Sequence, residues 1–244
     1  MYIKRNGSGA HVCIGIHGWS GDHNTFMPLV PFIPPQETLY SLDLPGHGKS
    51  PHPDRWDLEE ITSTIATGIE ALDVSQCTII GMCSGAIIGL LVAEKLKNKV
   101  DRLVIIDPFA YMPWYFRVFL NDTWGWYAYA STFANPVGRW ITNNALRSKR
   151  TADSDLTDSF ETIDHKVTYS YLKLLASVDG IEQFRSLSQP IDIVYGENTF
   201  GAIKHSLPKW QNLWPHATCR EINGVGHFPI KEATRQTSEV IFNT

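Results

Sequence analysis

The sequence predicts an α/β fold in which a mostly parallel sheet carries helices on both faces. Short runs rich in β-branched residues, such as 11–16 and 102–106, are followed by a glycine or proline turn and indicate buried strands. Segments with apolar residues at helical spacing, such as 57–73, lie between these runs. Strands that alternate with helices favour parallel pairing through right-handed crossovers. We therefore expect a functional site at the carboxyl ends of the strands.

The expected elements follow one another along the chain in this alternating order. The strands cover 2–5, 11–16, 38–42, 77–80, 102–106, 190–195 and 219–222. The helices cover 22–32, 57–73, 86–97 and 231–242. Asp57 is the expected N-cap of its helix, because its carboxylate can accept a hydrogen bond from a free amide of the first turn.

Composition argues against several classes of function. A net charge of −4 in 244 residues gives no reason to expect nucleic acid as a partner. No run approaches the ~18–20 apolar residues that span a bilayer, and the first residues lack the apolar run of a signal peptide. Cys13 and Cys77 fall inside expected buried strands, where cysteine acts as a small hydrophobic residue. We expect a cytoplasmic protein without cofactor or metal.

The stretch 81–85, Gly-Met-Cys-Ser-Gly, stands between the strand 77–80 and a helix. This setting is typical of the nucleophile elbow, a strained turn that exposes one side chain. Residues two before and two after the exposed one must be small, because the strand and the helix approach each other there. The two glycines satisfy this requirement only if Cys83 is the exposed residue. Centring the turn on Ser84 would place Met82 at a crowded position.

With this G-x-C-x-G elbow, the chain resembles the α/β-hydrolase superfamily, in which most members have serine at that position. The family's H-G-x turn is matched by residues 17–19, which follow the strand 11–16. The resemblance implies an oxyanion hole formed by the backbone amides of Trp19 and Ser84. Residues 43–50 match the family's D-x-P-G-x-G-x-S turn, to which we assign a structural role.

The resemblance also implies a general base and an acid that orients it. His227, in Gly-Val-Gly-His-Phe-Pro after the last expected strand, matches the family's histidine. The usual acid follows the next-to-last strand in G-x-x-D, but Thr199 stands at that position here. Asp107 matches an alternative acid position of the superfamily, and Glu197 lies two residues before the usual one. We prefer Asp107, and a cysteine nucleophile also needs less help from an acid than serine does.

Residues 108–185 are too long for an ordinary crossover between a strand and a helix. They coincide with the place where family members insert a helical cap, between what the family numbers as its sixth and seventh strands. We therefore expect a hydrolase core over 1–107 and 186–244 with a cap over 108–185. Twelve aromatic residues fall within 109–140.

So many aromatic side chains favour an apolar pocket under the cap. Packing of the cap alone, or a surface that faces a membrane or a partner, are the alternative interpretations. The expected substrate-binding residues are Trp114, Trp126, Phe109 and Phe228.

The function that these residues favour is an acyl hydrolase or thioesterase with a Cys83–His227–Asp107 triad and a covalent acyl-enzyme. The substrate would be an apolar acyl thioester, ester or lactone, as a small molecule or bound to a carrier. An acyltransferase, including one that cyclises its product, would use the same triad. A ligand-binding protein on the same scaffold is the alternative from another class. Cys83 could also mark a loss of function or an engineered replacement of serine, and the number of subunits stays open.

Overall fold

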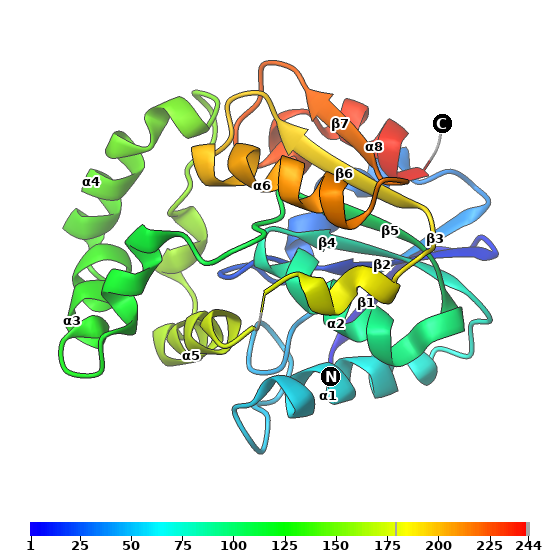
Figure 1. Cartoon of the computed structure of the whole chain (residues 1–244), viewed down its shortest axis with the longest axis horizontal. Helices are drawn as coiled ribbons and strands as arrows, with labels where there is room; N and C mark the ends of the chain where they lie inside the picture. Colours follow the sequence, from blue (N-terminus) through cyan, green and yellow to red (C-terminus); the bar gives the residue numbers. More distant parts are fainter. Residues whose placement is uncertain (179, 243–244) are drawn as a thin grey trace.

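A seven-stranded sheet with the order β1-β3-β2-β4-β5-β6-β7 forms the centre of the computed structural model, which describes residues 1–178 and 180–242 (Figure 1). Only the edge pair of β1 with β3 is antiparallel, and the other pairs are parallel. The predicted α/β fold is therefore confirmed. The strands are β1 (Ile3–Gly7), β2 (His11–Ile16), β3 (Glu37–Leu42), β4 (Cys77–Met82), β5 (Val100–Ile106), β6 (Ile191–Gly196) and β7 (Thr218–Ile222).

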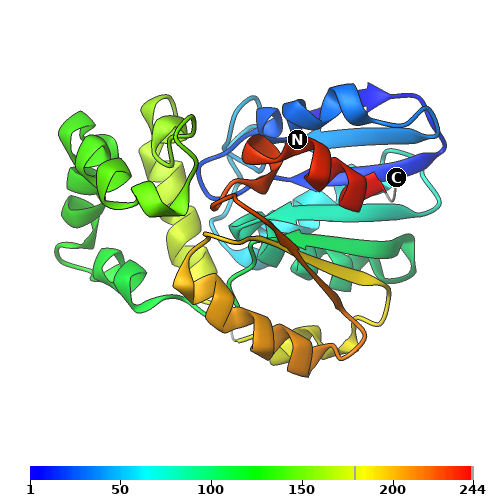
Figure 2. The ribbon, with the colours of Figure 1, turned by 90° about the horizontal axis from the view of Figure 1, so that it is seen from above.

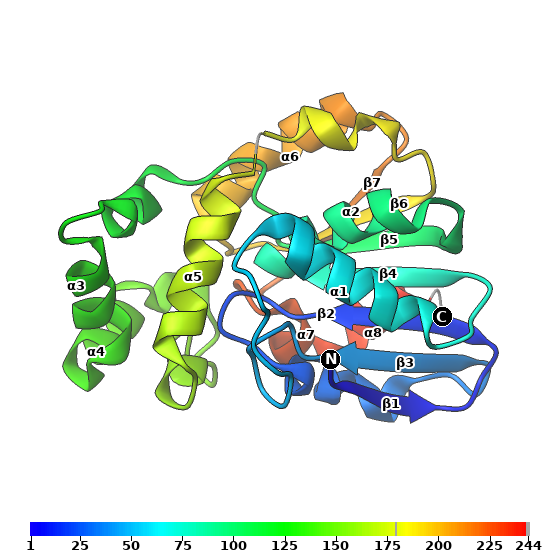
Figure 3. The same cartoon turned by 90° about the horizontal axis from the view of Figure 1, so that it is seen from below.

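Helices cover both faces of this sheet (Figures 2 and 3). One face carries α1 (Leu58–Glu70), α2 (Ser84–Leu96) and α6 (Gly201–Leu213) over the larger apolar core. The other face carries η1 (His23–Phe32), α7 (Pro229–Glu232) and α8 (Thr234–Phe242) over a second core. Asp57 caps α1 as predicted, since its carboxylate accepts the Glu60 amide at 2.7 Å. Among the described residues, none of the helices has both the length and the apolar character to cross a membrane.

Three helical elements differ from the prediction. The segment 22–32 is a 3₁₀ helix rather than an α-helix, and it contains Pro28 and Pro31, which cannot donate backbone hydrogen bonds. The expected helix 231–242 begins earlier and is broken at Ala233, whose backbone leaves the helical region. The α6 helix was absent from the predicted elements. Pro208 lies inside it and masks the helical pattern.

Most of residues 108–185, hereafter the cap segment, lies beyond the carboxyl ends of the strands, on the left in Figure 1, and the end of the segment returns to the body beside α2 and α6. In the strand numbering of this structure the segment joins β5 to β6, which correspond to the strands that the family numbers as its sixth and seventh. Its ordered elements are η3 (Trp114–Leu120), α3 (Gly125–Tyr129), the π-helical turn η4 (Ala130–Ala134), α4 (Pro136–Ala145), η5 (Arg147–Lys149), η6 (Asp158–Glu161), α5 (His165–Ala176) and the start of η7 (Glu182–Ser186).

The cap segment has an aromatic core of its own and also joins the main one. Tyr129, Phe133 and Phe160 pack together away from the sheet. Tyr171 of α5 and Phe184 of η7 belong to the larger core under α2. The α5 helix therefore connects the outer part of the cap segment to the body of the protein.

Candidate active site

Cys83 stands at the tip of a strained turn between β4 and α2. Its backbone has φ 55° and ψ −119°, a conformation that non-glycine residues rarely adopt and that costs of the order of 1–3 kcal/mol. The glycines on either side allow this close approach. A Cβ on Gly81 would lie 2.5 Å from Ala86 Cα, and one on Gly85 would lie 2.3 Å from the Ile16 carbonyl oxygen. The crowding expected around Cys83 is therefore present.

Ser84 occupies a different environment from its neighbour. It is the first residue of α2, and its buried hydroxyl has no hydrogen-bond partner within the described part of the chain. Cys83 is partly exposed and borders the same cavity as His227. The side chain with access to a base is thus the thiol of Cys83.

His227 is held by Asp107, the acid that we preferred. Its Nδ1 lies 2.7 Å from Asp107 Oδ2, in a buried pair. The Thr199 hydroxyl donates to the same carboxylate oxygen at 2.6 Å, and the Gly196 amide donates to the other at 3.3 Å. The backbone amide of His227 donates to the Lys149 carbonyl at 2.8 Å, which fixes the loop that carries the imidazole.

Glu197, the other candidate acid, points elsewhere. Its carboxylate accepts the Gly224 amide at 2.8 Å on the exposed side of the β6–α6 connection. From the sequence alone, Thr199 is only the residue that cannot be the acid. In the structure Thr199 is a partner of Asp107, a role that no local sequence signal reveals.

The electrostatics around His227 favour a charged imidazole. Burial lowers the pKa of His227, but the Cys83 thiolate and the hydrogen bond to Asp107 act more strongly together and raise it to about 10. Burial raises the pKa of Asp107, and hydrogen bonds from His227 and Thr199 act against that shift. This arrangement suits a thiolate–imidazolium pair oriented by a carboxylate.

The turn at 17–19 lies beside the elbow. A Cβ on Gly18 would lie 3.3 Å from the Cys83 Cβ. Within the residues described, the backbone amides of Trp19 and Ser84 have no hydrogen-bond acceptor. The His17 ring donates through Nδ1 to the Gly18 carbonyl at 2.8 Å, which orients the peptide that carries the Trp19 amide.

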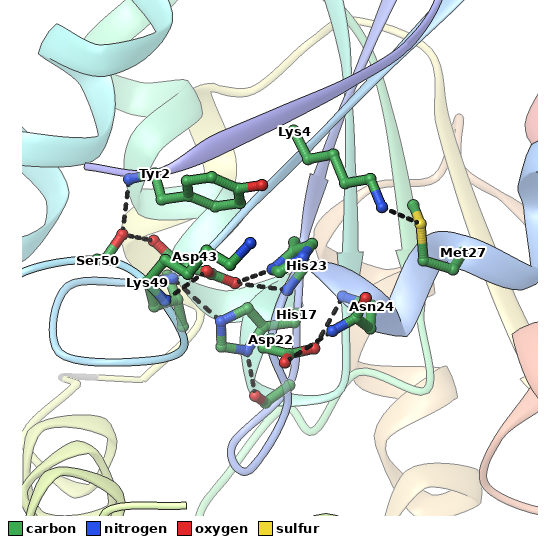
Figure 4. A network of polar contacts seen from close by, with 12 residues as sticks. Tyr2, Lys4, His17, Asp22, His23, Asn24, Met27, Asp43, Lys49 and Ser50 are labelled. Carbon is green, nitrogen blue, oxygen red and sulfur yellow. Dashed lines mark hydrogen bonds and ion pairs between the residues drawn. The ribbon is translucent and has the colours of Figure 1, made fainter.

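A network of polar contacts lies beside this turn (Figure 4), where the Leu44 amide donates to His17 Nε2 at 3.0 Å. Asp43 accepts the His23 amide at 2.6 Å, the His23 ring at 2.8 Å and the Lys49 amide at 2.8 Å. Although burial raises the pKa of Asp43, these bonds outweigh it and lower the pKa overall. Asp22 completes a group whose ligand atoms lie within 4.8 Å of one another, a spacing that a metal ion could bridge. Because both oxygens of Asp43 already accept N–H groups, we interpret the group as a brace for the loops.

Two cavities meet at Cys83. The larger has a volume of about 670 Å³ and is bordered by Phe109 and Phe228, as expected, together with His227. The smaller has a volume of about 110 Å³. Four further rings of the aromatic run 109–140 also line the larger cavity, although none was singled out in advance: Tyr115, Phe116, Phe119 and Phe133. Phe160 and Phe200, which lie outside that run, complete the lining and have no signal in the sequence.

The expectation that Trp114 and Trp126 line the pocket is wrong. Trp114 begins η3 with 76% of its surface exposed and borders neither cavity that contains Cys83. Trp126 packs inside the cap segment, where its ring lies 5.6 Å from that of Tyr129 and 5.2 Å from that of Tyr169. The aromatic pattern locates the cap segment but does not reveal which faces of its short helices point inward.

Glu232 is a second residue that the sequence did not point to. Its carboxylate accepts the Gly226 amide at 2.5 Å, the Ser154 hydroxyl at 2.5 Å and the Thr151 amide at 3.2 Å. These contacts tie the loop before His227 to the cap segment. They connect parts of the chain about 80 residues apart, a separation at which sequence spacing carries no signal.

Comparison with known proteins agrees with this fold. A pimeloyl-(acyl-carrier protein) methyl ester esterase from Aeromonas hydrophila is 23% identical over 255 residues, which cover 98% of this chain and 96% of that protein. The corresponding esterase from Neisseria meningitidis serogroup A is 30% identical over 95 residues, which cover 39% of this chain. The aligned stretch spans only 29% of that esterase.

A crystal structure of a bromoperoxidase from Bacillus anthracis superposes on the whole architecture. Its TM-score is 0.80 at 16% identity, over 99% of this chain and 94% of that one. A family model described as the alpha/beta hydrolase fold matches residues 14–234, from within β2 to the start of α8. With the strained elbow after β4 and the histidine loop after β7, this match shows that the chain belongs to the alpha/beta hydrolase fold family.

Proposed function

We propose that this protein is an acyl hydrolase that works through a covalent acyl-enzyme on Cys83. The observation that carries the proposal is a thiol and an imidazole at one cavity, with a buried carboxylate behind the imidazole. Cys83 occupies the tip of the elbow, His227 borders the same cavity, and Asp107 holds the far side of the imidazole at 2.7 Å. The cap segment would act as the cap that covers this site.

Each step of the proposed reaction uses a group in this arrangement. The Cys83 thiolate forms a bond to the acyl carbon, and the carbonyl electrons move to the oxygen. The Trp19 and Ser84 amides would donate to that oxyanion. When the tetrahedral intermediate collapses, the bond to the leaving group breaks and His227 gives that group its proton. Water then attacks the thioester, His227 takes a proton from it, and the acid and the free thiolate are released.

Similarity to esterases and the chemistry of sulfur support an activated ester or thioester as substrate. The Aeromonas hydrophila relative is a methyl ester esterase of an acyl group on a carrier protein. Thioesters, esters and lactones all release a group that His227 could protonate. A thioester substrate suits a cysteine particularly well, because one thioester is then exchanged for another of similar energy.

Intact-protein mass spectrometry tests the proposal. The protein would be incubated with acyl thioesters and p-nitrophenyl esters, quenched in acid within seconds, and weighed. We expect a mass increase of one acyl group that peptide mapping places on Cys83, and none in a Cys83→Ala variant. Tight binding of the substrates without an adduct or turnover would instead support a binding protein on the hydrolase scaffold.

A further inference from the structure

The two cavities that meet at Cys83 have different walls. The smaller one is lined by apolar groups of α2 and α5, including Ile87, Leu172 and Ala176, and no described residue in its lining is charged. The larger one combines aromatic rings with polar side chains such as Asn24, Thr142, Asp155, Asp158 and Lys231. The two spaces therefore suit chemically different groups.

A row of aromatic rings separates the two cavities. Trp19, Phe116 and Phe109 border both of them. The rings of Trp19 and Phe116 have centroids 5.5 Å apart, and those of Phe116 and Phe109 are 6.5 Å apart. The Trp19 indole also donates to the Thr168 carbonyl of α5 at 2.7 Å, which holds the row in place. A substrate attached to Cys83 must therefore place one part in each cavity, on opposite sides of this row of rings.

The position of His227 decides which part goes where. His227 borders the larger cavity and is absent from the lining of the smaller one. In acyl transfer the base must reach the atom that leaves and the atom that arrives, because it gives a proton to the first and takes one from the second. Both atoms must therefore lie in the larger cavity. The acyl chain, which exchanges no proton, is left with the smaller one.

Resting on the proposed function, we infer that the substrate is a short apolar acyl group joined to a larger, amphiphilic alcohol or thiol. The acyl chain occupies the cavity of Ile87, Leu172 and Ala176. The leaving group, or an acceptor that replaces water, occupies the cavity beside His227.

The two volumes set the sizes of the two parts. An apolar cavity of about 150 Å³ binds benzene, with its six carbon atoms. The smaller cavity, at about 110 Å³, therefore has room for about four carbon atoms beyond the carbonyl. The larger cavity, at about 670 Å³, is several times more spacious and lies on the side of the leaving group. The protein should therefore discriminate among substrates by the length of the acyl chain more strongly than by the size of the leaving group.

Two thioester series and two matched variants test this assignment. One series varies the acyl group from acetyl to octanoyl on N-acetylcysteamine. The other keeps butanoyl and varies the thiol from ethanethiol to phenylmethanethiol and naphthylmethanethiol. Ala176→Phe fills the smaller cavity from α5, and Thr142→Phe fills the larger one from α4. Both place phenylalanine at a partly buried position of the cap segment. Thermal melting and Cys83 alkylation by iodoacetamide show that each variant is folded.

We expect kcat/KM of the unaltered protein to rise about fourfold per methylene up to pentanoyl and then level off. In Ala176→Phe the rise should level off two carbons earlier, at propanoyl, which lowers pentanoyl turnover about fifteenfold relative to acetyl. Because butanoyl is one carbon past that limit, every thioester of the thiol series should fall by the same factor of about four, and the order of the thiols should stay unchanged. Thr142→Phe should remove the preference for the naphthyl thiol and keep the acyl series. The reverse pattern, or a flat acyl series, would overturn the assignment. Absence of any acyl adduct on Cys83 would instead refute the proposed function.

Discussion

Replacing Asp107 by asparagine is the sharpest perturbation of the proposed triad. The carboxylate lies 2.7 Å from Nδ1 of His227, and the change preserves its size while removing its charge. An asparagine amide that points at Nδ1 as a donor would also stabilise the wrong tautomer of the imidazole. We therefore expect Asp107→Asn to lower the rate of acylation of Cys83.

The size of the effect follows from the bond that is lost. A hydrogen bond to a charged group contributes roughly 1.5–3 kcal/mol, and each 1.36 kcal/mol corresponds to a tenfold change in rate. Loss of the bond alone should thus slow acylation by about 10- to 150-fold. The tautomer effect would add to this figure.

Matched variants make the measurement specific. Glu197→Gln removes an exposed carboxylate that contacts the Gly224 amide and should change the rate by less than about twofold. Thr199→Val removes one hydrogen bond to Asp107, and its effect on the acylation rate should lie between those of Glu197→Gln and Asp107→Asn. The assay is stopped-flow acylation by a p-nitrophenyl ester, with melting temperatures as a check on folding. Equal small effects of Asp107→Asn and Glu197→Gln would refute the role of Asp107.

Three further predictions concern the thiol, the imidazole and the cap segment. Iodoacetamide should modify Cys83 first, as measured by peptide mapping, because burial raises the pKa of the other three thiols, that of Cys77 to about 12; slowest labelling of Cys83 would contradict this. His227 should remain protonated at pH 8 by NMR and lose its proton at lower pH in Cys83→Ala. Because the pKa of His227 is raised to about 10 in the folded protein, its protonation stabilises the fold fully below about pH 6.5, and this stabilisation is lost as the pH rises towards 10. The melting temperature of the unaltered protein should therefore fall more steeply between these pH values than that of Cys83→Ala. Trp126→Ala should destabilise the fold by about 3 kcal/mol in urea unfolding, whereas Trp114→Ala should change stability by less than about 0.5 kcal/mol; equal effects would mean that their packing differs from that described.

Local patterns sufficed to predict the parts of the site that lie within a few residues of one another. The elbow could be centred on Cys83 because glycine spacing and steric crowding are properties of five consecutive residues, and the 2.5 Å approach of Gly81 to Ala86 has that local origin. The sheet could be predicted because its central strands β2, β4, β5 and β6 are largely apolar runs. His227 could be singled out because the sequence Gly-Val-Gly-His-Phe-Pro after the last strand matches the setting of the family's histidine.

Contacts across long stretches of chain lay outside the reach of these patterns. Glu232 touches Thr151 and Ser154 through backbone and hydroxyl groups that any sequence offers. The inward and outward faces of η3 and α3 differ by one or two residues of rotation, so Trp114 and Trp126 could not be assigned by composition. For the same reason the row of rings between the two cavities has no signature in the sequence.

The carboxylate at 107 and the threonine at 199 depend on each other, because their side chains are in direct contact. The Thr199 hydroxyl lies 2.6 Å from Asp107 Oδ2, and the Asp107 carboxyl is fully buried. An aspartate at 199 would bring a second carboxylate against the first, and two carboxylates this close in a buried site cannot both ionise. One of them would hold a proton and weaken the field that orients His227. A chain that places its acid at Asp107 therefore needs a neutral hydrogen-bond donor at 199, and threonine supplies one that also favours the charged form of Asp107.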